Sequence, residues 1–172
     1  MALRVDLGGG IVARITFKNM QEYELRLSRL GKKTREIAGI AIYGAADIVA
    51  NEIRRGIESL PVVSGYGTPE KPLPGGVTRA QKEGLLDGLG IAKMQDDGGF
   101  LNVKIGFDGY NATTTDRYPK GQPNQLVARG AESGTTWKKK SPFVRPAVNR
   151  AKPAAEQKMQ QVIDQETNTV MK

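Results

Sequence analysis

The strongest pattern of apolar and polar residues lies between residues 34 and 60. Apolar side chains recur there at spacings of three and four residues, at Ile42, Ala45, Val49, Ile53 and Ile57. This spacing places them on one face of an α-helix. Pro61 ends the pattern because proline lacks a backbone N–H and restricts the residue before it. The sequence therefore predicts a long amphipathic helix from about Thr34 to Leu60.

The end of the chain carries a second helical stripe. Its apolar residues near one face are Val148, Ala151, Ala155, Met159, Val162 and Ile163. This helix is predicted to begin at Pro146 or Ala147 and to run into the 160s. Pro153 falls in its first turns, where a proline can kink the axis. Residues 167–172 are expected to be a frayed tail.

Shorter elements are predicted between and before these helices. Residues 79–89 and the segment from Pro123 to Gly134 are expected to be short helices, and Asn19 is a candidate N-cap for another. Residues 11–18 alternate between apolar and polar, which is typical of a half-buried strand.

A β-hairpin is predicted around an Asp/Gly-rich turn. The runs at residues 91–94 and 101–105 are strand-like, and they flank Asp96-Asp97-Gly98-Gly99. Phe107 extends the second strand. The combination of helices and hairpin predicts one α+β domain over residues 1–172, with a small antiparallel sheet or hairpin packed by the long N-terminal helix and the C-terminal helix.

Long connections separate these elements. Residues 61–78 hold four prolines and four glycines and are predicted to be a long flexible loop, and residues 108–122 a polar loop. Residues 1–10 are expected to be a flexible N-terminus. Residues 135–146 are expected to be an extended basic arm, because prolines restrict the backbone around Phe143. Loops longer than about 12–15 residues are usually functional or disordered until bound.

The composition excludes several kinds of chemistry. The chain has no Cys and no His, so disulfides, thiolate nucleophiles, zinc hydrolase sites and Ser-His-Asp catalysis are excluded. No acidic pair has a recognisable catalytic context, and a carboxylate-based enzyme is the least favoured class. We expect no enzyme activity, no cofactor and no metal site. No run of about 20 apolar residues predicts a membrane span, and the start lacks the apolar core of a signal peptide, so cytoplasmic synthesis is expected.

The net charge of +8 is concentrated in the last quarter of the chain. Such an asymmetry indicates a polyanion, an acidic protein surface or simply a solvated face. Around the run Lys138, Lys139 and Lys140, the lysines could meet DNA phosphates while aromatic rings stack on bases. Alternatively, Trp137 and Phe143 could fill apolar pockets of a partner while the lysines stay in water. The second interpretation is favoured, and the three lysines remain candidate contacts with DNA or an acidic partner.

Several short motifs follow one another in a characteristic order. The long helix ends in Leu60-Pro61-Val62-Val63-Ser64-Gly65, and a short helix with Leu85-Leu86 and the hairpin follow. Glu132-Ser133-Gly134-Thr135 then precedes Ser141-Pro142-Phe143-Val144-Arg145-Pro146-Ala147 at the start of the last helix. This order, over residues 33–166, resembles that of the head–tail joining proteins (neck or tail-completion proteins) of long-tailed bacteriophages, including prophages. The lysine run departs from the family, which often has a small-residue or Met-Pro-rich link there.

The resemblance implies a structural virion protein. Such subunits form a closed ring between the portal and the tail tube, with DNA passing through its channel. It implies a homo-oligomer with portal (connector) and tail proteins as partners, transient contact with DNA, and a location in the virion neck after assembly in the host cytoplasm. Candidate subunit-interface residues are Val62, Val63, Tyr66, Trp137, Phe143 and Arg145. Two alternatives stay open: a tail-terminator ring subunit, and a sequence-independent nucleic-acid-binding protein.

Overall fold

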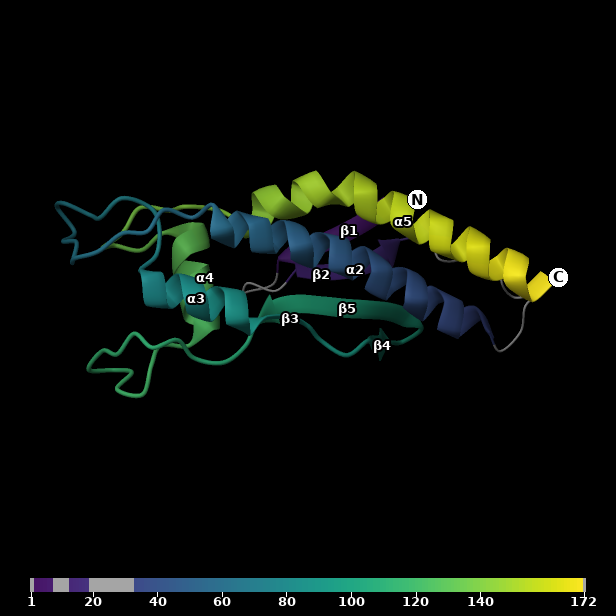
Figure 1. Ribbon diagram of the computed structural model, residues 1–172, viewed down its shortest axis with the longest axis horizontal. Coiled ribbons are helices and arrows are strands. Elements are labelled where there is room, and N and C mark those ends of the chain that lie inside the picture. The colour runs from purple at the N-terminus through teal and green to yellow at the C-terminus, as the bar shows by residue number, and fades with distance from the viewer. Residues whose placement is uncertain (1, 8–12, 19–32, 172) are drawn as a thin grey trace.

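The computed structural model describes residues 2–7, 13–18 and 33–171 and has an α+β fold (Figure 1). Two long helices, α2 (Thr34–Glu58) and α5 (Val144–Met171), lie side by side along the long axis of the molecule and run in opposite directions. They pack with a small antiparallel sheet. The predicted fold class is therefore confirmed.

The sheet has five strands within the described residues: β1 (Ala2–Leu7), β2 (Ala13–Lys18), β3 (Leu89–Ile91), β4 (Gln95–Asp97) and β5 (Phe100–Phe107). Their order is β1-β2-β5-β3, and β4 also pairs with β5. Every pairing is antiparallel. Alternate residues of β5 are buried in the core, as expected for a strand with one face on the helix layer.

The core lies where α2, α5 and β5 meet. Both helical stripes predicted from the sequence are buried: Ile42, Ala45, Val49, Ile53 and Ile57 from α2, and Val148, Ala151, Ala155, Met159, Val162 and Ile163 from α5. The alanines allow the two helix backbones to approach closely. Each fully buried isoleucine contributes about 1.5–3 kcal/mol relative to an exposed one, so the stripes account for much of the packing energy.

The N-terminal segment differs from the prediction. Residues 2–7 were expected to be flexible but form β1, which pairs in register with β2 from Ala2 opposite Lys18 to Leu7 opposite Ala13. The sequence already alternates apolar and polar from Leu3 to Leu7, a strand period that the glycines after it obscured. The predicted strand at 11–18 is confirmed over Ala13–Lys18. The helix predicted after Asn19 lies outside the described residues.

The predicted hairpin is present, but its first strand is divided. Ile91 lies opposite Ile105 and Gln95 opposite Asn102, so three residues on one side face two on the other. This extra residue is a β-bulge, which bends a strand and redirects a side chain. The bulge brings Met94 to α2, where its backbone N–H donates to the Tyr43 hydroxyl at 2.8 Å.

The last helix is longer than predicted. It begins at Val144 and continues to Met171, so the expected fraying from residue 167 is wrong as far as Met171. Val162 and Ile163 are the last residues of the described helix face that are buried in the core, and the residues from 164 to 169 are exposed or half-buried. Pro153 lies inside the helix without ending it, because the flanking Ala151 and Ala155 are both buried.

An ion pair joins the last turns of α2 to the first turns of α5. Arg150 Nε on α5 donates to Glu52 Oε1 on α2 at 2.7 Å, and Arg55 Nη1 donates to Glu52 Oε2 at 3.1 Å. The hydrogen bond from Arg150 is the main reason that the pKa of Glu52 is lower than its usual value. Glu52 therefore stabilises the folded state above the pKa it has in the unfolded chain, and this stability is lost as pH falls through the lower folded pKa.

Replacing Glu52 with Gln is expected to lower the free energy of unfolding by less than about 1 kcal/mol at pH 7, since both arginines are exposed to solvent. Urea unfolding of the variant and the wild type should show this difference shrinking below about pH 4.3, the usual pKa of an unfolded Glu. Glu58→Gln, at an exposed position of the same helix, is the matched control. A loss that stays constant with pH would show that the charge of Glu52 is not its cause.

Candidate functional site: a cleft between two loops

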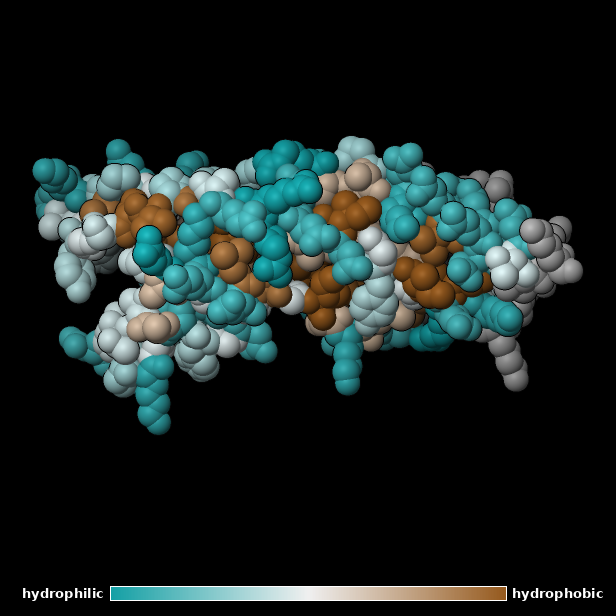
Figure 2. Space-filling view, viewed as in Figure 1, coloured by the Kyte–Doolittle hydropathy of each residue, from teal (hydrophilic) through white to brown (hydrophobic). Residues whose placement is uncertain are grey.

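Two loops leave the same end of the molecule and stand apart (Figure 1). They are residues 61–78 and residues 108–122, and the space between them is a cleft of about 990 Å³. The space-filling view shows the molecule hollowed at this end (Figure 2). We call this space the loop-end cleft. Residues 63–67 and 113–115 line its two walls. The rest of the lining comes from α4 (Asn124–Ser133), from residues 134–138, and from Leu73, Thr78, Gln81 and Gln122.

The first wall is fastened at its base by backbone hydrogen bonds. Val77 N–H donates to the Pro61 carbonyl at 3.0 Å, and Val63 N–H donates to the Val77 carbonyl at 2.9 Å. Gly76 has a positive φ of 139°, and a Cβ there would lie 2.4 Å from the Pro61 oxygen. Only glycine therefore allows the loop to close on itself here.

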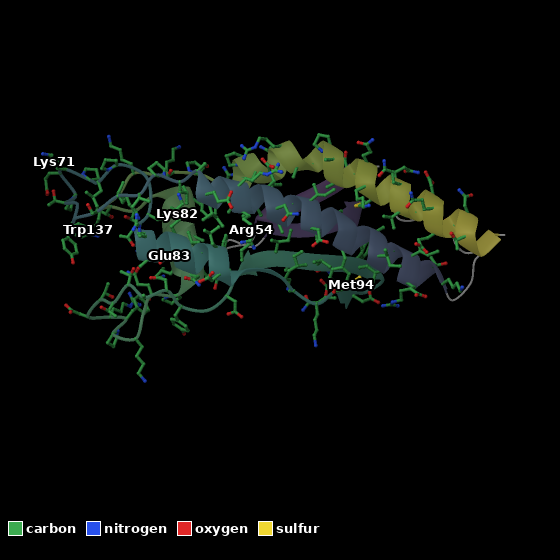
Figure 3. All side chains as sticks on the ribbon, in the orientation of Figure 1. Arg54, Lys71, Lys82, Glu83, Met94 and Trp137 are labelled. Carbon is green, nitrogen blue, oxygen red and sulfur yellow. The ribbon has the colours of Figure 1, made fainter. Side chains whose placement is uncertain are left out.

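A lysine of α3 (Arg79–Gly88) fixes the point where α2 passes into this loop. The Lys82 Nζ donates to the carbonyls of Glu58 and Leu60, at 2.6 and 2.9 Å. These carbonyls lie at the helix end, where no intrahelical partner remains and a cation is favourable. Lys82 and Trp137 both lie at the loop end of the molecule (Figure 3).

The segment predicted to be an extended basic arm is folded against the first wall. Thr135 and Lys138 exchange backbone hydrogen bonds in a tight turn. Leu73 N–H donates to the Trp137 carbonyl and Lys139 N–H to the Leu73 carbonyl, each at 2.9 Å. The prediction of an extended basic arm over residues 135–146 is wrong for residues 144–146, which already belong to α5. The ladder ties the preceding part of the segment to residues 61–78.

A buried carboxylate connects two of the motifs found in the sequence. Glu132, only 9% exposed, accepts the backbone N–H groups of Phe143 and Val144 on Oε2, at 2.8 and 2.9 Å. Its Oε1 accepts the N–H of Arg145 at 3.0 Å. These groups lie at the start of α5, where they have no partner within the helix and where a negative charge is favoured. The Glu132–Thr135 motif thus caps the helix that the Ser141–Ala147 motif begins.

The second wall is anchored by two buried asparagines that no sequence pattern singled out. The Asn111 side-chain N–H₂ donates to the Gln122 carbonyl at 2.9 Å and to Asn124 Oδ1 at 3.3 Å, and Asn124 donates to the Asp108 carbonyl at 2.8 Å. A Cβ at Gly84 of α3 would lie 2.4 Å from the Asn111 Cβ. The loop is therefore packed tightly against α3 at its base.

The six candidate interface residues differ in their positions: some line the cleft, some are exposed elsewhere, and one is buried. Tyr66 and Trp137 are exposed and line the loop-end cleft, and Val63 lines it half-buried. Val62 and Arg145 are exposed outside the cleft lining.

Phe143 does not belong to the exposed group. It is 3% exposed and packs edge-on against Phe107, with ring centroids 5.9 Å apart. Its candidacy as an interface residue is therefore wrong, because it is part of the core between β5 and α5. Gly56 of α2 makes room for it, since a Cβ there would lie 3.0 Å from the Phe143 carbonyl oxygen.

The cleft is positively charged and otherwise neutral. Among the described residues that line it, Arg129 and Lys138 are the only charged ones, and the rest are apolar, hydroxyl, amide or glycine residues. Burial lowers the pKa of Lys138 below that of an ordinary lysine. Lys139 and Lys140 are exposed and lie outside the cleft lining. No carboxylate or imidazole stands beside these hydroxyls among the lining residues that the structure describes. The site is therefore suited to binding by shape, apolar contact and positive charge.

The described part of the chain contains neither a cluster of metal-binding side chains nor a membrane-spanning helix. Its acidic side chains form no group of three or more that could hold a metal ion, and none of its helices has the length and hydropathy to cross a membrane. Comparison of the whole chain with protein-family models, curated proteins and solved structures found no match. The function must therefore be argued from the residues themselves.

Proposed function

We propose that this protein is a structural subunit of a long-tailed bacteriophage that assembles as a ring between the head and the tail. The observation that carries the proposal is the convergence of the motifs behind the family resemblance. The Leu60–Gly65, Glu132–Thr135 and Ser141–Ala147 motifs are distant in sequence, yet together they build the first wall of the loop-end cleft and fix the start of α5.

The exposed residues at that end support an assembly role. Tyr66 is fully exposed, and Val62 and Trp137 are more than half exposed. Large exposed apolar side chains grouped around a cleft are typical of surfaces that bind another protein. In a ring, each copy would use such a surface against its neighbour or against the portal-side and tail-side proteins.

The experiment has two readouts. Purified protein, alone and mixed with the portal and tail proteins encoded beside it, is expected to form rings in negative-stain electron microscopy, and mass spectrometry is expected to detect it in purified virions. A chain that stays monomeric in every mixture and is absent from virions would overturn the proposal. Tight binding of duplex DNA by that monomer, weakening steeply with salt, would favour the nucleic-acid-binding alternative. The exposed side chains of Lys139 and Lys140 support that alternative, because they are free to contact phosphates.

A further inference from the structure

One face of α4 lines the loop-end cleft. The cleft-lining residues of this helix recur at helical spacing, so they lie on the same side of it: Leu126, Arg129, Gly130 and Ser133. Leu126 is 42% exposed although its side chain is large and apolar. The helix therefore presents to the cleft an apolar side chain that packing within the described chain does not cover.

Aromatic side chains of the cleft add to this apolar surface. Trp137 is 55% exposed and Tyr66 is fully exposed, and both line the cleft. Because Tyr66 is fully exposed, the cleft is open at its rim, as the hollow in Figure 2 shows. Small-molecule pockets bury most of the surface of their ligand. An open cleft of about 990 Å³ is better suited to a segment of polypeptide.

The charged side chains of the lining are both cations. Among the described residues, no carboxylate forms an ion pair with Arg129 or Lys138. Burial disfavours the charged form of Lys138 and lowers its pKa. A cation that loses water without gaining a counterion is unfavourable, and a bound anion offsets this cost. The charge of the cleft is therefore complementary to an anionic occupant.

The arrangement favours an acidic peptide over a nucleic acid. A single-stranded nucleic acid carries a charge at every nucleotide and binds in grooves whose cations follow its backbone. The described lining has only two cations, and Lys139 and Lys140 of the same segment lie outside it. A peptide with a few carboxylates between apolar side chains matches both the charge and the apolar surface of the lining.

We propose that the loop-end cleft binds an acidic, apolar peptide segment of a partner protein. Its carboxylates would pair with Arg129 and Lys138, and its apolar side chains would pack on Leu126 and Trp137. The inference deepens the proposed function, because it names the chemistry of the segment that a head-side or tail-side protein would insert. It rests on that function only for the source of the segment, since one copy of the chain holds the whole cleft.

The first test uses Trp137, the single tryptophan of the chain, as a reporter in the cleft. The probes are short synthetic peptides with Glu, Gly and Leu in shuffled order, each labelled with a dye. Their binding is measured by dye anisotropy and is expected to shift the emission of Trp137. Peptides with Lys in place of Glu, or Ser in place of Leu, are expected to bind at least about tenfold more weakly, because each loses one kind of contact.

Three outcomes of this titration would overturn the inference. They are the absence of binding by every Glu–Leu peptide, binding that leaves the emission of Trp137 unchanged, and tighter binding of the Lys peptides. Single-stranded oligothymidylate is the fourth probe. If it shifts the emission of Trp137 and binds more tightly than the Glu–Leu peptides, the occupant is a nucleic acid and not an acidic peptide.

The second test separates the cleft from the net charge of the protein. Arg129→Ala with Lys138→Ala removes two positive charges from the lining, and Lys139→Ala with Lys140→Ala removes two beside it. The first double variant is expected to weaken peptide binding at least about tenfold. The second should weaken it less than about twofold, since exposed charges outside the contact are screened by salt.

Thermal unfolding of both double variants should match the wild type, because none of the four side chains is buried in the core. Equal losses of peptide binding in the two would overturn the inference, since net charge alone would then explain the binding. Rings that form from a chain that binds no peptide would overturn this inference and leave the proposed function intact. Peptide binding by a chain that is absent from virions would overturn only the proposed function.

Discussion

Replacing Phe143 with alanine is expected to lower the free energy of unfolding by about 3–5 kcal/mol, the usual cost of emptying a buried aromatic site. Phe143 is 3% exposed and its ring packs against that of Phe107. Its backbone lies close to α2 at Gly56. The cavity would lie between α2, β5 and α5, whose backbones are fixed by their own hydrogen bonds and cannot collapse to fill it. Urea unfolding followed by circular dichroism measures the loss.

Trp137→Ala provides the contrast. Trp137 is 55% exposed and its ring lines the loop-end cleft, so its removal should change the free energy of unfolding by less than about 0.5 kcal/mol. Phe143→Leu keeps most of the volume and should cost less than the alanine change. Equal losses for Phe143→Ala and Trp137→Ala would contradict the placement of Phe143 in the core and of Trp137 on the surface.

The same pair shows where prediction from the sequence stops. Phe143 and Trp137 share one short segment rich in lysine and proline, and nothing in their local pattern separates a core residue from a surface one. The distinction depends on Phe107 and Gly56, which are distant in sequence. By contrast, the stripe from Ile42 to Ile57 was predictable, because helical periodicity is a local property that the buried face of α2 reproduces.

In the strands, too, the features set by neighbouring residues could be predicted, and the features set by distant contacts could not. The hairpin turn was predictable because Gly98-Gly99 supplies the positive φ angles that the turn requires. The bulge before the turn was not predictable, because it depends on the contact between Met94 and Tyr43 of α2, which is distant in sequence. The strand of residues 2–7 could have been found from its alternation, and the long loop 61–78 was located correctly.

The candidate site was predicted only in part. Tyr66, Val63, Trp137 and Lys138 were singled out and do line one cleft. The opposite wall was missed, because the buried Asn111 lies in a polar loop whose other polar residues are exposed or half-buried, and its buried partner Asn124 lies at the start of α4. A cleft formed by segments far apart in sequence cannot be inferred from either segment alone.

Glu132→Ala is expected to lower the free energy of unfolding by about 2–4 kcal/mol, since the carboxylate is buried and accepts three backbone N–H groups that would lose their partner. Glu132→Gln keeps the shape and one acceptor oxygen but removes the charge and forces an amide N–H₂ toward donors. It should therefore recover only part of the stability. Glu58→Ala, at an exposed position of α2, is the control for loss of a glutamate.

Hydrogen exchange distinguishes a local loss of stability at the start of α5 from a loss of stability of the whole fold. In Glu132→Ala, the amides of Phe143, Val144 and Arg145 should exchange faster than the change in global stability alone requires, because water must now satisfy them. Faster exchange at Lys139, whose N–H donates to Leu73, would show that the cap also holds the cleft wall in place, since only residues 140–142 separate Lys139 from Phe143. Unchanged protection of all four amides would mean that the carboxylate is not what holds the start of α5 beside the cleft.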